Sequence, residues 1–251
     1  MRSYKTEAIV IKRHNFLEKD RILTLFSKEK GKISTIAKGA RRPGSRFSYH
    51  SDLGTIAIFH LHRGKNIDLI TEVTPIFSPI EAHGRLDRSE KIGYAFKLLD
   101  KLYHEHEPHL PTFEVLAQTI RAVSSNDYQL TFLIFLAKVI EDLGLKPEFI
   151  NCLECGRQLK ENDKINFDHR GGLIHCDCAG GGIKNVSNSE IKLLRLIFSN
   201  SFEKIGKAKV EVKIFEKVFT IVRNYLEWHF GKILPEKILW IMNGELWIID
   251  W

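Results

Sequence analysis

The stretch RILTLFSKEKGKISTIA, residues 21–37, contains two short runs of alternating apolar and polar residues on either side of a polar turn with Gly31. Alternation with a period of two places apolar side chains on one face of a β-strand. Similar segments, each bounded by Gly, Pro or Asn, lie at residues 6–15, 53–62 and 66–73. Five short strands before Pro75 and Pro79, which we expect to end this region, predict an N-terminal β-barrel at residues 1–80. A five-stranded barrel of the oligonucleotide-binding (OB) type fits this length.

Positive charge is concentrated in this barrel region. The chain of 251 residues has 38 Lys and Arg against 31 Asp and Glu, a net charge of +7, and 43% of its residues are hydrophobic. This composition excludes a disordered or fibrous chain. Residues 1–65 contain fifteen of the cationic residues but only five of the acidic ones, so the remainder is slightly acidic. Such asymmetry favours a polyanion as the partner of the first region.

The sequence KGARRPGSR, residues 38–46, is the most cationic part of this region and is interrupted by two glycines and a proline. It predicts an exposed loop between strands that contacts DNA phosphates, although a merely solvated turn is the alternative. The predicted DNA-binding residues are Lys12, Arg13, Lys38, Arg41, Arg42 and Arg46. Candidates for stacking on bases are Phe16, Phe47 and Tyr49, each of which could equally belong to the core.

Helical periodicity follows the barrel region. Ile92, Phe96 and Leu99 recur at helical spacing, and the apolar run at 130–140 is too short to span a membrane and predicts a buried helix. SNSE, residues 187–190, is typical of a capping box. We therefore expect a helical domain at residues 81–149 and 184–251. Asn243-Gly244 between two apolar runs predicts a terminal hairpin. No leader sequence is recognisable at the N-terminus, so we expect a cytoplasmic protein with reduced cysteines.

Four cysteines interrupt the helical pattern at residues 150–183: Cys152, Cys155, Cys176 and Cys178. A Cys-x-x-Cys-Gly turn brings two thiolates together, and four ligands of this kind form a closed tetrahedral zinc site. We therefore expect a zinc finger with one structural zinc ion. Cys176 is the first choice in the irregular half, His175 is the alternative fourth ligand and His169 a remote one. A disulfide or redox pair is the competing interpretation.

The sequence contains no recognised catalytic motif. There is no G-x-S-x-G, no phosphate loop and no paired-carboxylate pattern, and the histidines of YHEHEPH do not have the spacing of a helical H-E-x-x-H site. We therefore expect a binding protein and not an enzyme. The competing classes are a zinc-ribbon RNA-binding protein, an interaction scaffold, and a nuclease with an unrecognised site.

Four stretches resemble the RecO family of bacterial recombination mediators: T-x-A-I-V-I-K-R at 6–13, residues 18–42, CLECG and GGLIHCDC. The resemblance extends over essentially the whole chain and includes the order of barrel, helical domain and inserted finger. Family members with the finger usually have C-x-x-C in its second half, which aligns with His175-x-x-Cys178 and leaves Cys176 extra. The tail after Trp240 also looks longer than is usual in the family.

The resemblance implies a nucleoid-associated mediator of DNA repair and homologous recombination. Such a protein binds single- and double-stranded DNA, anneals complementary strands without a required cofactor and, with its partner RecR, promotes recombinase loading on strands coated with single-strand-binding protein (SSB). It also implies that the helical domain captures the acidic, apolar C-terminal tail of SSB. The cationic residues available for that tail are Lys204, Lys207, Lys209, Lys213 and Lys217.

Overall fold

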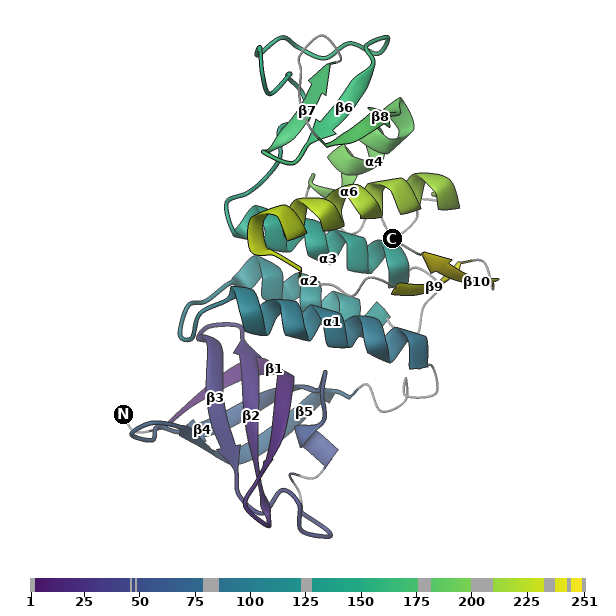
Figure 1. Cartoon of the computed structure of the whole chain (residues 1–251). Helices are drawn as coiled ribbons and strands as arrows, with labels where there is room; N and C mark the ends of the chain where they lie inside the picture. The colour runs from purple at the N-terminus through teal and green to yellow at the C-terminus, as the bar shows by residue number, and fades with distance from the viewer. Residues whose placement is uncertain are drawn as a thin grey trace. The chain divides into compact units, whose positions relative to one another are not determined.

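The computed structural model describes residues 3–45, 47, 49–78, 86–122, 128–175, 182–199, 210–232, 238–242 and 245–249. The chain divides into two compact units, Met1–Ser125 and Asn126–Trp251, and each is described by itself. Figure 1 shows a β-barrel and two helices in the first unit, and helices with small sheets in the second. Among the described helices, none is both long enough and apolar enough to cross a membrane.

Five strands of the first unit close into a barrel in the order β1-β2-β3-β5-β4. All neighbouring strands are antiparallel except β3 and β5, which are parallel at Thr35–Asp68 and Ile36–Leu69. The strands are β1 (Ser3–Phe16), β2 (Asp20–Ser27), β3 (Gly31–Ala37), β4 (Ile56–His62) and β5 (Asp68–Phe77). The alternating inward side chains of these strands fill the barrel, with Phe59 and Leu25 fully buried. The expected five-stranded OB-type barrel is confirmed.

Strand β5 continues past the point at which the sequence predicted its end. Pro75 was expected to close the barrel region, but it pairs in register with Ala57 and the strand runs on to Phe77. A proline has no N–H to donate, so it suits a strand edge. The recorded pairing with β3 involves Asp68 and Leu69, and Pro75 lies beyond it. The ladder to β4 is also irregular between Ile56 and Ala57.

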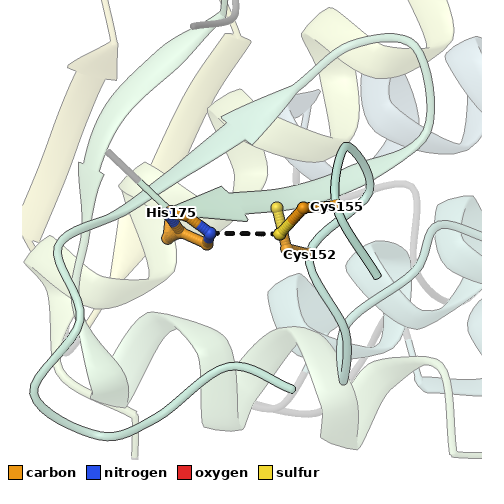
Figure 2. Close-up of side chains that lie close together, drawn as sticks. All are labelled: Cys152, Cys155 and His175. Atoms are coloured by element: carbon orange, nitrogen blue, oxygen red, sulfur yellow. Dashed lines mark hydrogen bonds between the residues drawn. The ribbon is translucent and has the colours of Figure 1, made fainter. Parts of the chain in front are cut away.

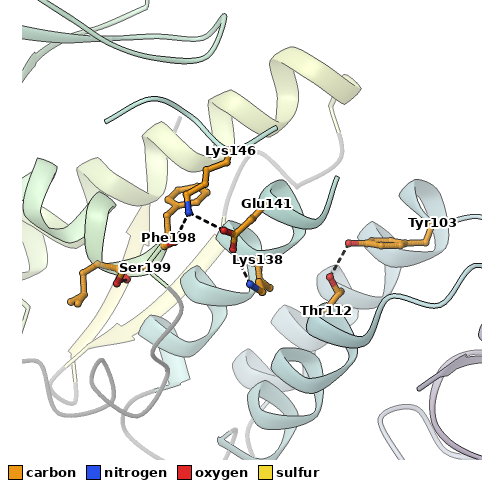
Figure 3. Close-up of polar contacts among 8 residues, drawn as sticks. Tyr103, Thr112, Lys138, Glu141, Lys146, Phe198 and Ser199 are labelled. Carbon is orange, nitrogen blue, oxygen red and sulfur yellow. Dashed lines mark hydrogen bonds and ion pairs between the residues drawn. The ribbon is translucent and has the colours of Figure 1, made fainter. Parts of the chain in front are cut away.

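Two helices complete the first unit, α1 (Leu86–Leu102) and α2 (Leu110–Arg121), and a short 3-10 turn η1 (Tyr49–Ser51) precedes β4. The segment between α1 and α2 packs on the barrel, because the ring of Tyr103 meets Phe26 edge to face at 5.5 Å between centroids. The N–H of His106 donates to the carbonyl of Lys32 at 2.9 Å. The Tyr103 hydroxyl lies 3.0 Å from the hydroxyl of Thr112, at the start of α2 (Figure 3).

The helices described in the second unit are α3 (Tyr128–Asp142), α4 (Asn188–Ile197) and α6 (Val212–Phe230). The predicted capping box is confirmed, because Ser187 accepts from the N–H of Glu190 and the Glu190 carboxylate accepts from the N–H of Ser187. The ammonium group of Lys146 joins the end of α3 to the end of α4. It donates to the Glu141 carboxylate at 2.9 Å and to the Phe198 carbonyl at 3.1 Å (Figure 3).

Two small sheets belong to the second unit. The strands β6 (Ile165–Asp168), β7 (Gly172–His175) and β8 (Ile183–Val186) form a sheet in the order β7-β6-β8. This sheet lies in the predicted finger region, and β6 and β7 are the hairpin that NFDHRGGLI indicates. The strands β9 (Ile238–Met242) and β10 (Glu245–Ile249) pair antiparallel, as expected for the predicted terminal hairpin. The turn residues 243–244 lie outside the described residues.

Candidate metal centre and nucleic-acid interface

Two cysteines and a histidine of the finger converge on one point. The ligand atoms of Cys152, Cys155 and His175 all lie within 4.8 Å of one another. Figure 2 shows the imidazole of His175 pointing toward the two sulfurs. Its Nε2 lies 3.2 Å from the Sγ of Cys155. Two thiolates and one imidazole are donors that suit a tetrahedral structural zinc site. This group could therefore hold a metal ion.

The backbone around Cys152 forms the turn that brings the two sulfurs together. The N–H of Gly156 donates to the Cys152 carbonyl at 2.9 Å, and the N–H of Cys152 donates to the Arg157 carbonyl at 2.8 Å. Gly156 has a φ of +72°, a left-handed conformation that favours glycine. The glycine of the Cys-x-x-Cys-Gly motif thus reverses the chain directly after Cys155.

The surroundings of the Cys152 thiol lower its pKa. Burial opposes its charge, since only 2% of the residue is exposed. Hydrogen bonds from the backbone N–H groups of Cys155, His175 and Glu154 outweigh burial and lower the pKa of Cys152 to about 7. Because the thiolate is the form that ligates a metal, these bonds favour the ligand state near neutral pH.

The structure places the other candidate zinc ligands differently. Cys176 and Cys178 lie outside the described residues, so the choice of Cys176 as a ligand is not tested by the structure. The alternative, His175, is the residue that joins the cluster, from the end of β7. The remote candidate His169 lies elsewhere, with its ring stacked on Trp228 at 6.0 Å between centroids.

Ion pairs brace the finger around this cluster. The carboxylate of Asp168 is held by the guanidinium of Arg170 at 2.8 Å, and the same guanidinium pairs with Glu154 inside the Cys-x-x-Cys turn. The guanidinium of Arg157 pairs with Asp163 at 2.9 Å. The Arg170 pairs connect the Cys-x-x-Cys turn to the β6–β7 hairpin, and the Arg157 pair connects the end of this turn to the segment that precedes β6.

The loop at residues 38–46, which is predicted to contact DNA, follows β3 and is tied to the β1–β2 turn. The N–H of Arg41 donates to the carbonyl of Lys19 at 2.9 Å, and the N–H of Gly39 donates to the carboxylate of Asp20 at 2.7 Å. The side chains of Lys38, Arg41 and Arg42 are exposed, and Gly39 and Gly44 have φ values of +68° and +73°. The loop thus presents three cations on a fixed backbone, while Arg46 lies outside the described residues.

The two predicted cations of β1 already have acidic partners. The Lys12 ammonium lies 2.6 Å from the Asp100 carboxylate, and the guanidinium of Arg13 pairs with Asp52. Both cationic side chains remain almost half exposed. Exposed pairs of this kind are worth at most about 1 kcal/mol. Phosphates would therefore have to compete with these carboxylates, which makes Lys12 and Arg13 weaker candidates than the loop cations.

The three aromatic residues considered for stacking on bases differ in their exposure. Phe16, the last residue of β1, is 39% exposed, whereas Phe47 packs against the barrel core. The side chain of Tyr49 lies outside the described residues. Sequence reasoning missed the neighbour of Phe16: Leu17, in the β1–β2 turn, is 73% exposed. Two adjacent apolar residues in a polar turn were the signal that could have identified it.

Comparison with known proteins gives the family. The family model described as Recombination protein O N terminal matches residues 1–79, and the model described as Recombination protein O C terminal matches residues 84–238. The chain belongs to the RecO family. Members of this family act in DNA repair and recombination, which agrees with a closed barrel of OB type.

Relatives from several bacteria match nearly the whole chain. A protein of Desulforamulus reducens named DNA repair protein RecO is 30% identical over 237 residues, which cover 93% of this chain and 92% of that protein. A protein with the same name in Desulfitobacterium hafniense (strain Y51) is 31% identical, and the match covers 97% of this chain and 90% of that protein. A third protein of this name, in Dehalococcoides mccartyi (strain CBDB1), is 29% identical, and the match covers 97% of this chain and 96% of that protein.

Proposed function

We propose that this RecO family member binds single- and double-stranded DNA through the barrel loops and anneals complementary strands. With RecR, it would promote recombinase loading on SSB-coated DNA. The observation that carries the proposal is the exposed cationic loop, anchored by backbone hydrogen bonds at one end of a closed OB-type barrel. Barrels of this type bind strands by combining a cationic groove with surfaces for bases. The role requires positioning of strands and no bond chemistry, so we propose a protein without catalytic activity.

Binding should depend on charge and not on sequence. Lysine and arginine contacts to phosphates carry no base information, and forked contacts favour arginine. We therefore propose Lys38, Arg41, Arg42 and Arg46 as the main contacts, with Lys12 and Arg13 contributing less because Asp100 and Asp52 compete for them.

The test is a binding and annealing series with the purified full chain. Fluorescence anisotropy on single-stranded DNA, duplex DNA and RNA of matched sequence should show binding to both DNA forms with strong salt dependence. Mixing complementary strands should show faster annealing with the protein. Preference for RNA would instead support the RNA-binding class, and degradation of the DNA with added magnesium would identify a nuclease.

We also propose that the finger holds one structural zinc ion. Cys152, Cys155 and His175 supply three donors that already converge, and Cys178 completes the set with the two-residue spacing His175-x-x-Cys178. A closed set of four protein donors leaves no position for a substrate, so the ion would stabilise the finger and not react.

A groove between α4 and α6 supports capture of an SSB tail. It has a volume of about 400 Å³, and its walls are formed by Ser189, Lys192, Leu193, Leu196, Val210, Glu211 and Ile214. Apolar walls beside Lys192 and the exposed Lys213 suit an apolar peptide that ends in acidic residues. Of the other cations predicted for this tail, Lys217 donates to the Lys184 carbonyl at 3.3 Å, and Lys204, Lys207 and Lys209 lie outside the described residues.

The tail proposal is tested with a labelled peptide of the SSB C-terminus. Binding to the wild-type chain at low salt should weaken in Lys192→Glu, which reverses an exposed charge on the wall of the groove, while Lys97→Glu reverses an exposed charge on α1 and is the control. Equal binding to all three proteins would place the tail outside this groove, and no binding to the wild-type chain would refute the proposal.

A further inference from the structure

The β1–β2 turn presents an apolar tip among cations. Leu17 is 73% exposed and Phe16 is 39% exposed, although each would be stabilised by burial. Leu17 also has a φ of +50°, in the left-handed region that residues other than glycine rarely adopt. Such a conformation costs on the order of 1–3 kcal/mol and persists when the surroundings hold it in place. The tip thus combines exposure and backbone strain in one leucine.

The loop after β3 holds this strained residue. The guanidinium of Arg41 donates to the carbonyl of Leu17 at 3.0 Å. The N–H of Arg41 donates to the Lys19 carbonyl and the N–H of Gly39 donates to the Asp20 carboxylate, so three hydrogen bonds fix the turn at Leu17 and directly after it. A backbone that is fixed in this way loses little freedom when its exposed side chain meets a partner.

The charges around the tip identify its partner. Lys19, Lys38, Arg41 and Arg42 are exposed here, while Glu18 and Asp20 are the acidic residues of the same turn. Asp20 is occupied by the N–H of Gly39, so the cations outnumber the acids at the surface. A partner that is anionic along its length and apolar between its charges fits this arrangement. A DNA strand has that chemistry, and the β1–β2 loop is one of the two loops with which OB-type barrels contact oligonucleotides.

We propose that Leu17, flanked by Phe16, is an apolar wedge that enters between neighbouring bases of the strand held by the cationic loop. Proteins that insert apolar side chains into base steps separate the stack at a cost of a few kcal/mol per step, which the surrounding contacts offset. Bases separated in this way are exposed to a complementary strand. The inference rests on the proposed DNA binding and adds a base-separating residue to the phosphate contacts.

The test uses an oligo-dA strand in which 2-aminopurine, quenched when stacked, replaces adenine at regular intervals. Saturating wild-type protein should raise the fluorescence, and Leu17→Met, which keeps an apolar side chain, should raise it equally. Leu17→Gly should bind with the same salt slope but lose the rise, and it should fold, because glycine accepts a positive φ. Leu53 is another exposed leucine of this unit, 37% exposed with no positive φ, so Leu53→Gly is the matched control and should behave as wild type.

The outcomes distinguish the two proposals. If wild-type protein does not bind the strand, the proposed DNA binding fails together with the wedge. If it binds and Leu17→Gly gives the wild-type fluorescence rise, or if wild type gives no rise, the wedge is wrong while DNA binding stands. Loss of the rise in Leu53→Gly as well would also overturn the assignment to Leu17.

Discussion

Gly31 occupies the turn between β2 and β3, where the segment after α1 contacts the barrel. Its φ is +66°, and a Cβ at this position would lie 1.9 Å from the carbonyl oxygen of Glu107. No displacement of a flexible side chain can relieve that contact, because the neighbouring atoms belong to the backbone. Glycine is therefore required here for two independent reasons, one of conformation and one of space.

Gly31→Ala should destabilise the first unit far more than Gly44→Ala. Gly44 has a similar φ of +73°, but nothing lies within 4 Å of the place that a Cβ would occupy, so this control reports the backbone cost alone, about 1–2 kcal/mol. Gly31→Ala adds displacement of the segment at Glu107. Urea unfolding of both variants measures the difference, and equal losses of unfolding free energy would show that the segment does not pack on the turn.

Asp100 connects α1 to two barrel lysines. Its carboxylate lies 2.6 Å from the Lys12 ammonium and 3.5 Å from that of Lys32. Partial burial by itself would raise the pKa of Asp100, but hydrogen bonds and charges from the two lysines outweigh it and hold that pKa below its usual value. A carboxyl group with a lowered pKa in the folded state stabilises the fold above its unfolded pKa of about 4.

Asp100→Asn should therefore cost stability at pH 7 and progressively less as the pH falls. The stabilisation by the carboxylate is complete above about pH 4 and is lost as the pH falls through the lowered folded pKa. Urea midpoints of wild type and variant at pH 7 and pH 3 measure this. A gap in unfolding free energy that is the same at both pH values would mean that the charge of Asp100 does not stabilise the fold.

At the scale of elements, the finger depends on a turn and a hairpin that are separate in the sequence. Gly172 begins β7 where a Cβ would lie 2.5 Å from the carbonyl oxygen of Glu148, so the hairpin packs tightly on the chain that leads into Cys152. The N–H of Leu153 also donates to the carbonyl of Leu173 at 2.9 Å. These backbone contacts bring His175 to the cysteine turn.

Metal analysis of single variants tests the donor set. We expect about one zinc per chain in the wild type and in Cys176→Ser, which is the matched control, and loss of zinc in Cys178→Ser. His175→Ala should weaken retention of zinc under a chelator. Zinc loss in Cys176→Ser with retention in His175→Ala would reverse the assignment, and full zinc in the double variant Cys152→Ser/Cys155→Ser would refute the site.

Much of each element was predictable because its signal is local. The alternation in residues 21–37 predicted β2 and β3, and Ser187 with Glu190 predicted the start of α4. Strand β5 was predicted too short, because Pro75 forbids a central strand but not the edge position it occupies. The spacing of the cysteines located the finger but favoured Cys176 over His175, the residue that the structure brings to the cluster, since a difference of one residue depends on the strand that presents it.

At the scale of the whole molecule, what the sequence could not show are the contacts between distant residues. The barrel closes through a parallel pairing of β3 with β5, and the Lys12–Asp100 pair joins residues 88 positions apart. That pair changed the ranking of the DNA-binding candidates, because a cation with a carboxylate partner looks the same in sequence as one without. The concentration of positive charge in residues 1–65 was readable at once, and it is the property on which the proposed DNA binding depends.

The salt dependence of DNA binding tests the central claim, which is that the cations of the loop at residues 38–46 contact DNA phosphates. Lys38→Gln/Arg42→Gln removes two exposed cations and leaves the Arg41–Leu17 contact intact. Lys28→Gln/Lys30→Gln is the matched control, because it changes the net charge by the same amount. These lysines lie in the β2–β3 turn, at the other end of β3 from the loop at residues 38–46.

The measurement is the affinity for a single strand across a salt series, from which the slope of log K against log salt is obtained. Each phosphate contact contributes about 0.7 to the slope, so the loop variant should lose roughly 1.4 while the control keeps the wild-type slope. A folded loop variant with wild-type affinity and slope, or an equal loss in the control, would contradict the account.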